Sequence, residues 1–166
     1  MSEQITGAER KRAKHLHAVL LFDLIVNHII FFLVTATVWK QTHLPALLMP
    51  VLSLALLGYI LIRAQRSLSR EPSWFVRCHW QLAAKRARAF LLLFAVMGSF
   101  SAAVYYGGHA IGMKTLATQA LTVGVGILPF MITLLVLVVV EFDAEQQCTV
   151  GSVPPSAIAA YPAPQE

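Results

Sequence analysis

Apolar residues gather in four long runs that polar segments separate from one another. The runs cover residues 18–39, 44–62, 89–106 and 116–140. A helix needs about 20 apolar residues to cross the hydrocarbon core of a bilayer, so each run is long enough for one crossing. Backbone groups in lipid must be bonded within their own segment, which favours helices over open strands. The pattern predicts an all-α integral membrane protein, a bundle of four transmembrane helices.

Composition supports a membrane protein rather than a soluble one. Of the 166 residues, 57% are hydrophobic and only 13% are charged, whereas a soluble domain averages about 25% charged residues. The length suits one domain. No small-residue cleavage site follows the first apolar run, so we expect this run to be a retained helix and not a cleaved signal peptide.

The basic residues predict which side of the membrane each connection faces. Four of the 13 Lys and Arg residues precede the first run, and seven lie between the second and third runs. Lys40 and Lys114 stand alone in the other two connections. The positive-inside rule then places both termini in the cytoplasm, as in a bacterial inner (plasma) membrane protein. Trp39, Tyr105 and Tyr106 would lie at the outer interface, where aromatic residues are enriched.

The cytoplasmic parts fall into three segments: a basic N-terminal segment (1–17), a basic loop (63–88) and a tail (141–166). Pro72 should end any helix that continues from the second run. A new helix after it would present a basic, aromatic surface to anionic headgroups or to a partner. The residues of this surface are Trp74, Arg77, Trp80, Lys85, Arg86 and Arg88. The tail is acidic, then rich in Pro and Ala, and we expect it to be disordered.

Three polar residues interrupt the first apolar run: Asp23, Asn27 and His28. Asp23 and Asn27 are four residues apart and share a helix face, whereas an α-helix would turn His28 about 100° away from Asn27. Ionisable groups inside a membrane are costly, so they mark functional sites by default. This intramembrane polar cluster is therefore either part of a proton or cation pathway or a set of hydrogen bonds between helices.

The third and fourth runs carry small residues at helix-packing spacing. The set comprises Ala95, Gly98, Ser99, Ala102, Ala120 and Gly124. Residues of this size let helix backbones approach closely in a membrane. Pro129 should kink the fourth helix, because it cannot donate the hydrogen bond of its turn.

Sequence motifs for catalysis, cofactors and metals are lacking. Cys78 and Cys148 are 70 positions apart without a second cysteine nearby, and His28 is the one deep histidine, so neither a zinc motif nor a haem-ligand pair is expected. Nucleic acid is not expected as a partner, since topology explains the basic residues. We expect no cofactor and no enzymatic activity.

Three functions remain open. The first is a non-catalytic accessory, assembly or interaction subunit, with another membrane protein or a second copy of the chain as its partner. The second is an ion, proton or small-solute transport component that uses Asp23, Asn27 and His28. A haem-binding or redox subunit ranks third.

Overall fold

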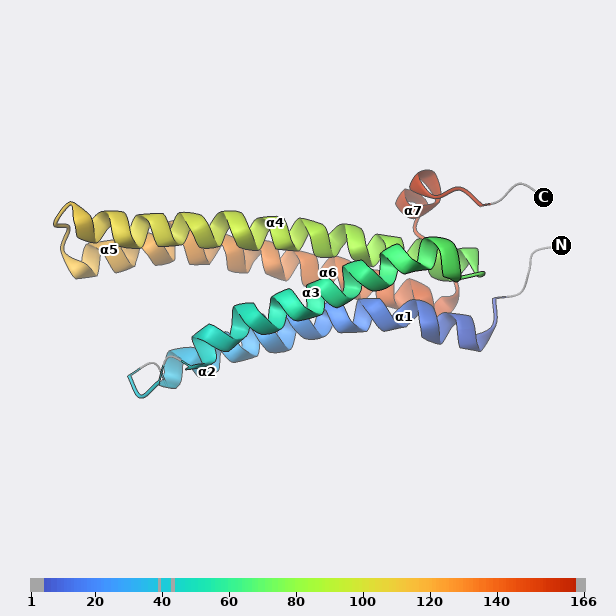
Figure 1. The fold of residues 1–166 in the computed structure, drawn as a ribbon, viewed down its shortest axis with the longest axis horizontal. Helices are drawn as coiled ribbons and strands as arrows, with labels where there is room; N and C mark the ends of the chain where they lie inside the picture. Colours follow the sequence, from blue (N-terminus) through green and yellow to red (C-terminus); the bar gives the residue numbers. More distant parts are fainter. Residues whose placement is uncertain (1–4, 39, 43, 164–166) are drawn as a thin grey trace. The chain divides into compact units, whose positions relative to one another are not determined.

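The computed structural model describes residues 5–38, 40–42 and 44–163, and the described chain is helical without strands (Figure 1). Four helical segments are long and apolar enough to cross a membrane, which confirms this part of the prediction. The first comprises α1 (Gly7–Phe22), the π-helix η1 (Asp23–Ile30) and α2 (Phe31–Val38), and the second is α3 (Leu44–Arg70). The third is α4 (Trp74–Ala110). The fourth comprises α5 (Thr115–Leu121), the π-helix η2 (Thr122–Ile127) and α6 (Leu128–Val150), and a short α7 (Pro155–Ala160) follows.

The chain divides into two compact units. The first unit contains Met1–Arg88 and Val138–Glu166, and the second contains Ala89–Leu137. The long helices α4 and α6 therefore each contribute residues to both units. Trp39 and His43 lie outside the described residues, so the predicted interfacial position of Trp39 is not addressed by the structure.

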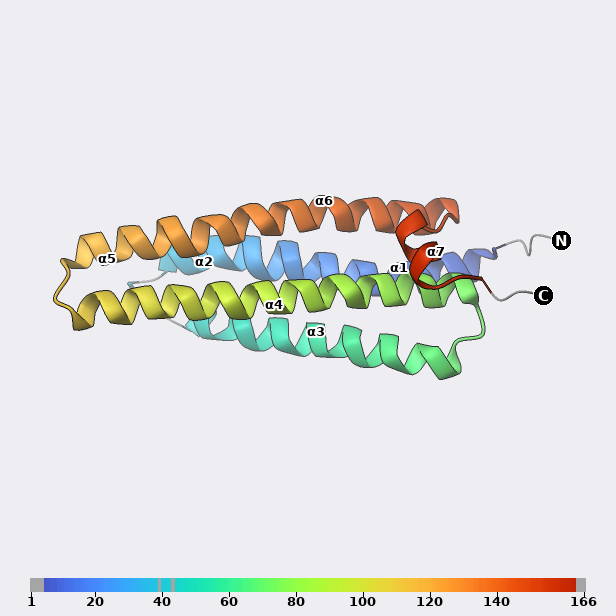
Figure 2. The same cartoon turned by 90° about the horizontal axis from the view of Figure 1, so that it is seen from above.

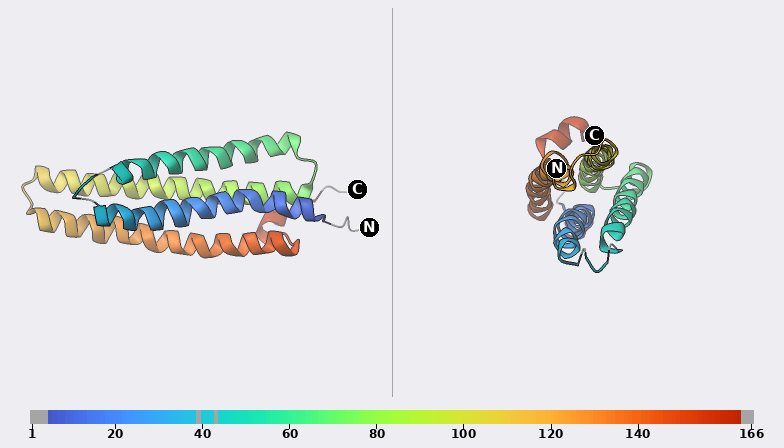
Figure 3. Two further views of the ribbon diagram at one scale, coloured as in Figure 1. Left: turned by 90° about the horizontal axis from the view of Figure 1, so that it is seen from below. Right: turned by 90° about the vertical axis from the view of Figure 1, so that its left-hand side faces the viewer.

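The first unit is built on the packing of the first helical segment against α3 (Figure 3). The buried residues of α3 recur every three or four positions, which keeps them on one face of the helix. These positions are Ser53, Leu57, Ile60, Ala64 and Ser67. Leu16, Leu20 and Leu24 are buried at the same kind of spacing in the first segment.

The second unit is a helical hairpin in which α4 runs beside α5, η2 and the start of α6 (Figure 2). Gly112 ends the α4 side with φ +74°, a left-handed conformation that glycine adopts without strain. Two close contacts hold the hairpin together. A Cβ on Gly126 would lie 2.0 Å from Oγ of Ser101, and one on Gly108 would lie 2.8 Å from Thr118.

The break at Pro72 lies where the sequence indicates it, between α3 and α4. The basic, aromatic surface expected after it is only partly exposed. Lys85 and Arg88 are exposed, but Trp80 is buried and donates a hydrogen bond from Nε1 to the carbonyl of Arg12 (2.8 Å). Trp80 is turned inward because residues 74–87 supply core positions of the first unit.

The described part of the tail contains helical residues that its composition did not indicate. Residues 141–150 continue α6, and Pro155 occupies the first turn of α7, where a proline suits a helix. Ala157 of α7 is buried in a cluster with Leu82 and Ala144. Nε1 of Trp74 donates a hydrogen bond to the carbonyl of Tyr161 (3.0 Å). These described residues of the tail pack against α4 within the first unit, an interaction that composition does not reveal.

Candidate functional site

Asp23 is the centre of the intramembrane polar cluster, and its carboxylate is fully buried. Oδ1 accepts a hydrogen bond from Nδ2 of Asn27 (2.9 Å), and Oδ2 accepts one from the hydroxyl of Ser53 on α3 (2.9 Å). Nδ2 of Asn27 also donates to the carbonyl of Met49 (3.0 Å). The cluster therefore joins η1 to α3 at two points, through Ser53 and through Met49.

The π-helical form of η1 brings His28 into this cluster, which corrects the expectation that His28 points elsewhere. Nδ1 of His28 lies 2.9 Å from the backbone carbonyl of Asp23 and 3.6 Å from its Oδ1. A π-helix has i→i+5 geometry, so residues 23 and 28 come one above the other. In an α-helix, which the apolar run alone predicts, these two residues would point in different directions.

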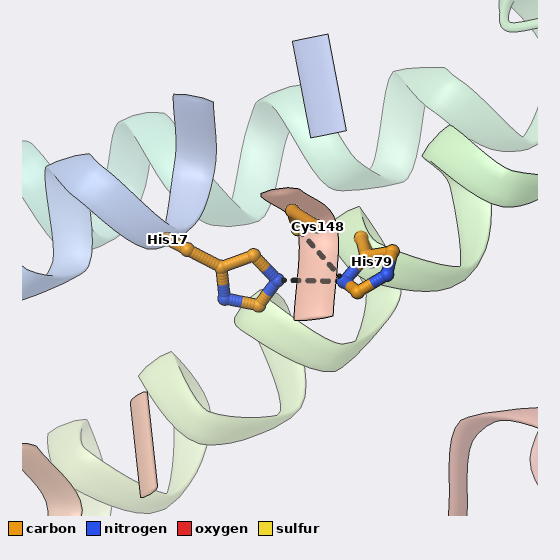
Figure 4. Close-up of side chains that lie close together, drawn as sticks. All are labelled: His17, His79 and Cys148. Atoms are coloured by element: carbon orange, nitrogen blue, oxygen red, sulfur yellow. Dashed lines mark hydrogen bonds between the residues drawn. The ribbon is translucent and has the colours of Figure 1, made fainter. Parts of the chain in front are cut away.

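A second buried cluster lies in the first unit, and we call it the His–Cys cluster: His17 of α1, His79 of α4 and Cys148 of α6 (Figure 4). All three side chains are fully buried. Nε2 of His17 lies 3.2 Å from Nδ1 of His79, and Sγ of Cys148 lies 3.1 Å from the same nitrogen. The ligand atoms of all three residues lie within 4.8 Å of one another.

Each imidazole of the His–Cys cluster is held by its outer nitrogen. Nδ1 of His17 lies 2.5 Å from Oε1 of Glu141, and Nε2 of His79 lies 2.9 Å from the carbonyl of Ser152. A carboxylate and a carbonyl can only accept, so both outer nitrogens donate. Arg86 in turn donates to Oε2 of Glu141 (2.8 Å) and to the carbonyl of Val140 (3.0 Å).

Two side chains of the cluster, His79 and Cys148, are in surroundings that favour their uncharged forms. His79 and Cys148 lie outside the predicted apolar runs. His79 falls between the run that ends at residue 62 and the run that begins at residue 89, and Cys148 follows the run that ends at residue 140. Burial lowers the pKa of His79 to about 4. Burial also raises the pKa of the Cys148 thiol to about 12, and the nearby Glu141 and Glu145 carboxylates act in the same direction. The lone pair of neutral His79 would suit metal binding, and a bound cation would favour the thiolate form of Cys148.

The His–Cys cluster was not expected from the sequence, because its members come from three helices that are distant along the chain. Two regularities of spacing could have indicated it. Glu141 and Cys148 are seven residues apart, as are His79 and Arg86. Seven residues make about two helical turns, so each pair lies on one helix face. In the structure the pair on α6 and the pair on α4 face each other, and His17 contacts one residue of each pair, Glu141 and His79.

The small residues that were expected to pack helices together are left open in the second unit. Ala95, Gly98, Ser99, Ala102, Ala120 and Gly124 are all exposed. A Cβ on Gly98 or Gly124 would meet no described atom within 4 Å, whereas Gly126 and Gly108 are the glycines in close contact. Pro129 is the second residue of α6, the helix that follows η2. The kink expected at this proline stays a prediction.

Comparison with protein-family models, with curated proteins and with solved structures finds no match to this chain. The two buried clusters and the open small-residue positions are therefore the observations from which a function can be argued.

Proposed function

We propose that this chain is a non-catalytic membrane protein that acts as an interaction subunit, binding another membrane-inserted helix through its second unit. The observation that supports this proposal is the open space at Gly98 and Gly124. Around Gly98, Ser99 and Ala102 extend the small-residue surface along α4, and Ala120 lies four residues before Gly124.

Small residues matter for association in lipid because apolar burial gives little driving force there. Lipid tails are as apolar as leucine, so helices associate through close van der Waals packing and hydrogen bonds. Within the hairpin itself this role is taken by Gly126 and Gly108. The exposed positions at Gly98 and Gly124 are thus surface of the kind against which a second helix packs.

The proposal includes an orientation and a location. Both ends of the four-span bundle would be cytoplasmic, in a bacterial inner membrane, because eleven of the 13 basic residues lie on that side. The exposed Lys85 and Arg88 would then lie near anionic headgroups, at about 1 kcal/mol for each basic residue at the surface.

The test is copurification from membranes in a mild detergent. Gly98→Leu and Gly124→Leu should each abolish recovery of the partner, or of a second tagged copy, at unchanged membrane abundance. Ala117→Leu is the matched control, since Ala117 is also small and exposed but is not part of the small-residue set. Unchanged copurification of both leucine variants would refute the interaction proposal.

A transport component is the second candidate, favoured by one observation. The π-helix η1 carries the buried Asp23 and His28 side by side, and π-helical segments frequently occur at functional sites. A buried acid and a buried imidazole can exchange a proton with a solute. Proton flux into vesicles that contain the purified protein should then disappear in Asp23→Asn. Equal flux with and without the protein would exclude this candidate.

A further inference from the structure

We propose that the His–Cys cluster binds a zinc ion through Nε2 of His17, Nδ1 of His79 and Sγ of Cys148. Glu141 and the carbonyl of Ser152 orient the two imidazoles from outside. The site is separate from the proposed function, since no residue of the second unit or of the intramembrane polar cluster takes part in it.

The spacing of the three ligand atoms is close to that of a tetrahedral site. Zinc binds imidazole nitrogen at about 2.0–2.1 Å and thiolate sulfur at about 2.3 Å, which puts neighbouring ligand atoms about 3.3–3.6 Å apart. Two of the three separations are close to these values: 3.2 Å between the imidazole nitrogens and 3.1 Å between Nδ1 of His79 and Sγ. The third, between Sγ and Nε2 of His17, is at most 4.8 Å, and binding would draw these two atoms together around the ion.

The outer hydrogen bonds are those that a metal-binding histidine requires. Such a histidine donates its other N–H to a carboxylate or a backbone carbonyl, which fixes the tautomer and turns the free nitrogen to the metal. His17 does this with Glu141, and His79 does it with Ser152. Arg86 holds the Glu141 carboxylate in turn. Both inner nitrogens are thereby left to face Cys148 and each other.

The inner atoms of the cluster compete for few hydrogens. Nε2 of His17 and Sγ of Cys148 both lie within hydrogen-bond distance of the same atom, Nδ1 of His79. Because Nε2 of His79 donates its hydrogen to Ser152, the lone pair of Nδ1 can accept from only one of them at a time. A cation between the three atoms satisfies all of their lone pairs at once.

The donor set indicates which ion fits. Two imidazoles and a thiolate suit zinc, whereas magnesium and calcium prefer oxygen ligands. Binding displaces the thiol proton of Cys148 to solvent, and the thiolate and the Glu141 carboxylate then supply two negative charges for the divalent ion. Three protein ligands leave the fourth tetrahedral position for water or an added ligand.

Cobalt substitution in the reduced, detergent-solubilised full chain tests the site directly, because Co²⁺ reports its ligands by absorption. We expect one equivalent of Co²⁺ to give tetrahedral visible bands and a sulfur-to-cobalt charge-transfer band, and one equivalent of Zn²⁺ to remove both. Cys148→Ser should lose the charge-transfer band. Cys78→Ser should keep it, since Cys78 is equally buried but donates its hydrogen bond to the carbonyl of Tyr161 (3.6 Å) and does not belong to the His–Cys cluster.

Two further measurements do not depend on removing a ligand. Glu141→Gln should weaken zinc binding by about 10–100-fold, the usual effect of losing an outer-shell partner. In the unaltered protein, zinc should slow alkylation of Cys148 and leave the rate at Cys78 unchanged. Absence of the charge-transfer band in the folded protein, its survival in Cys148→Ser, or exclusive binding of Cu⁺ would each overturn the assignment.

Discussion

At the scale of single residues, Asp23 and Asn27 form different hydrogen bonds in the intramembrane polar cluster. The carboxylate of Asp23 accepts from Asn27 and from Ser53, and Asn27 also reaches the carbonyl of Met49. Asp23→Asn can keep this pattern, because the Ser53 hydroxyl can accept from the new amide instead of donating to it. Asn27→Leu removes both bonds of the amide and leaves a buried carboxylate with fewer donors.

We therefore expect Asn27→Leu to lower the stability of the protein by about 1–3 kcal/mol, the cost of unsatisfied buried polar groups. Asp23→Asn should change stability much less. The measurement is thermal unfolding in detergent together with membrane abundance, and Ser53→Ala, which removes one bond only, is the control. A larger loss in Asp23→Asn than in Asn27→Leu would mean that the negative charge itself holds η1 to α3.

Arg86 carries a second prediction at this scale. It forms an ion pair with the fully buried Glu141 (2.8 Å), and Arg86→Leu would leave that carboxylate without its cation. Removing one partner of a buried pair usually costs about 3–5 kcal/mol. We expect a loss of this size in the unfolding free energy measured with a metal chelator present.

The exposed Arg88 on the same helix provides the control, because Arg88→Leu should have little effect. The double variant Arg86→Leu/Glu141→Leu should recover part of the loss, since neither charge is then left unpaired. A double variant that is less stable than Arg86→Leu would show that Glu141 stabilises the fold through His17 alone.

At the scale of helices, Gly124 and Gly126 lie two residues apart in the fourth helical segment, but their surroundings are different. A Cβ on Gly126 would lie 2.0 Å from Oγ and 3.0 Å from Cβ of Ser101, whereas one on Gly124 would meet nothing within 4 Å. The hydroxyl can rotate away, but the Ser101 Cβ cannot. Gly126→Leu should therefore force η2 and α4 apart and lower the melting temperature of the protein.

Gly124→Leu should leave the melting temperature of the isolated chain unchanged and affect only association with a partner. Comparing the two variants in one detergent separates packing inside the hairpin from binding outside it. Equal melting temperatures for Gly126→Leu and the unaltered chain would show that the Ser101 contact contributes nothing to the hairpin.

The sequence revealed the helices better than their details, for physical reasons. Lipid requires long apolar helices, so the four segments and the break at Pro72 could be read directly. The helical residues of the tail could not, because a proline that ends one helix also begins another, as Pro155 does. The π-helical geometry of η1 cannot be recognised from its residue types, so nothing in the sequence placed His28 beside Asp23.

The His–Cys cluster was missed for a different reason. His17 and His79 are 62 residues apart, and His79 and Cys148 are 69 apart. Local motifs report ligands that share a turn or a helix, whereas these ligands meet only after three helices have packed. The open positions of Gly98 and Gly124 likewise depend on which small residues the hairpin uses for itself.

At the scale of the whole molecule, the asymmetry of basic residues makes a prediction about topology. Eleven of the 13 lie in residues 1–17 or 63–88, and Lys40 and Lys114 lie in the two opposite connections. Moving these clusters across a membrane would oppose the positive-inside rule. The C-terminal end and residues 63–88 should therefore be cytoplasmic, and the turn at Gly112 should be external.

Reporter fusions measure this arrangement. Alkaline phosphatase, which is active only outside the cytoplasm, should be active when fused after Gly112 and inactive when fused at the C-terminal end. Moving the positive charge should move the topology: replacing Arg10, Lys11, Arg12 and Lys14 by Gln while adding lysines beside Lys114 should lower activity after Gly112. The reason is that the orientation depends on the difference in basic residues across the membrane and not on their total number. Phosphatase activity at the C-terminal end of the unaltered chain would contradict the four-span topology. His17, His79 and Cys148 would then lie on the opposite side of the membrane from the one that this topology gives them.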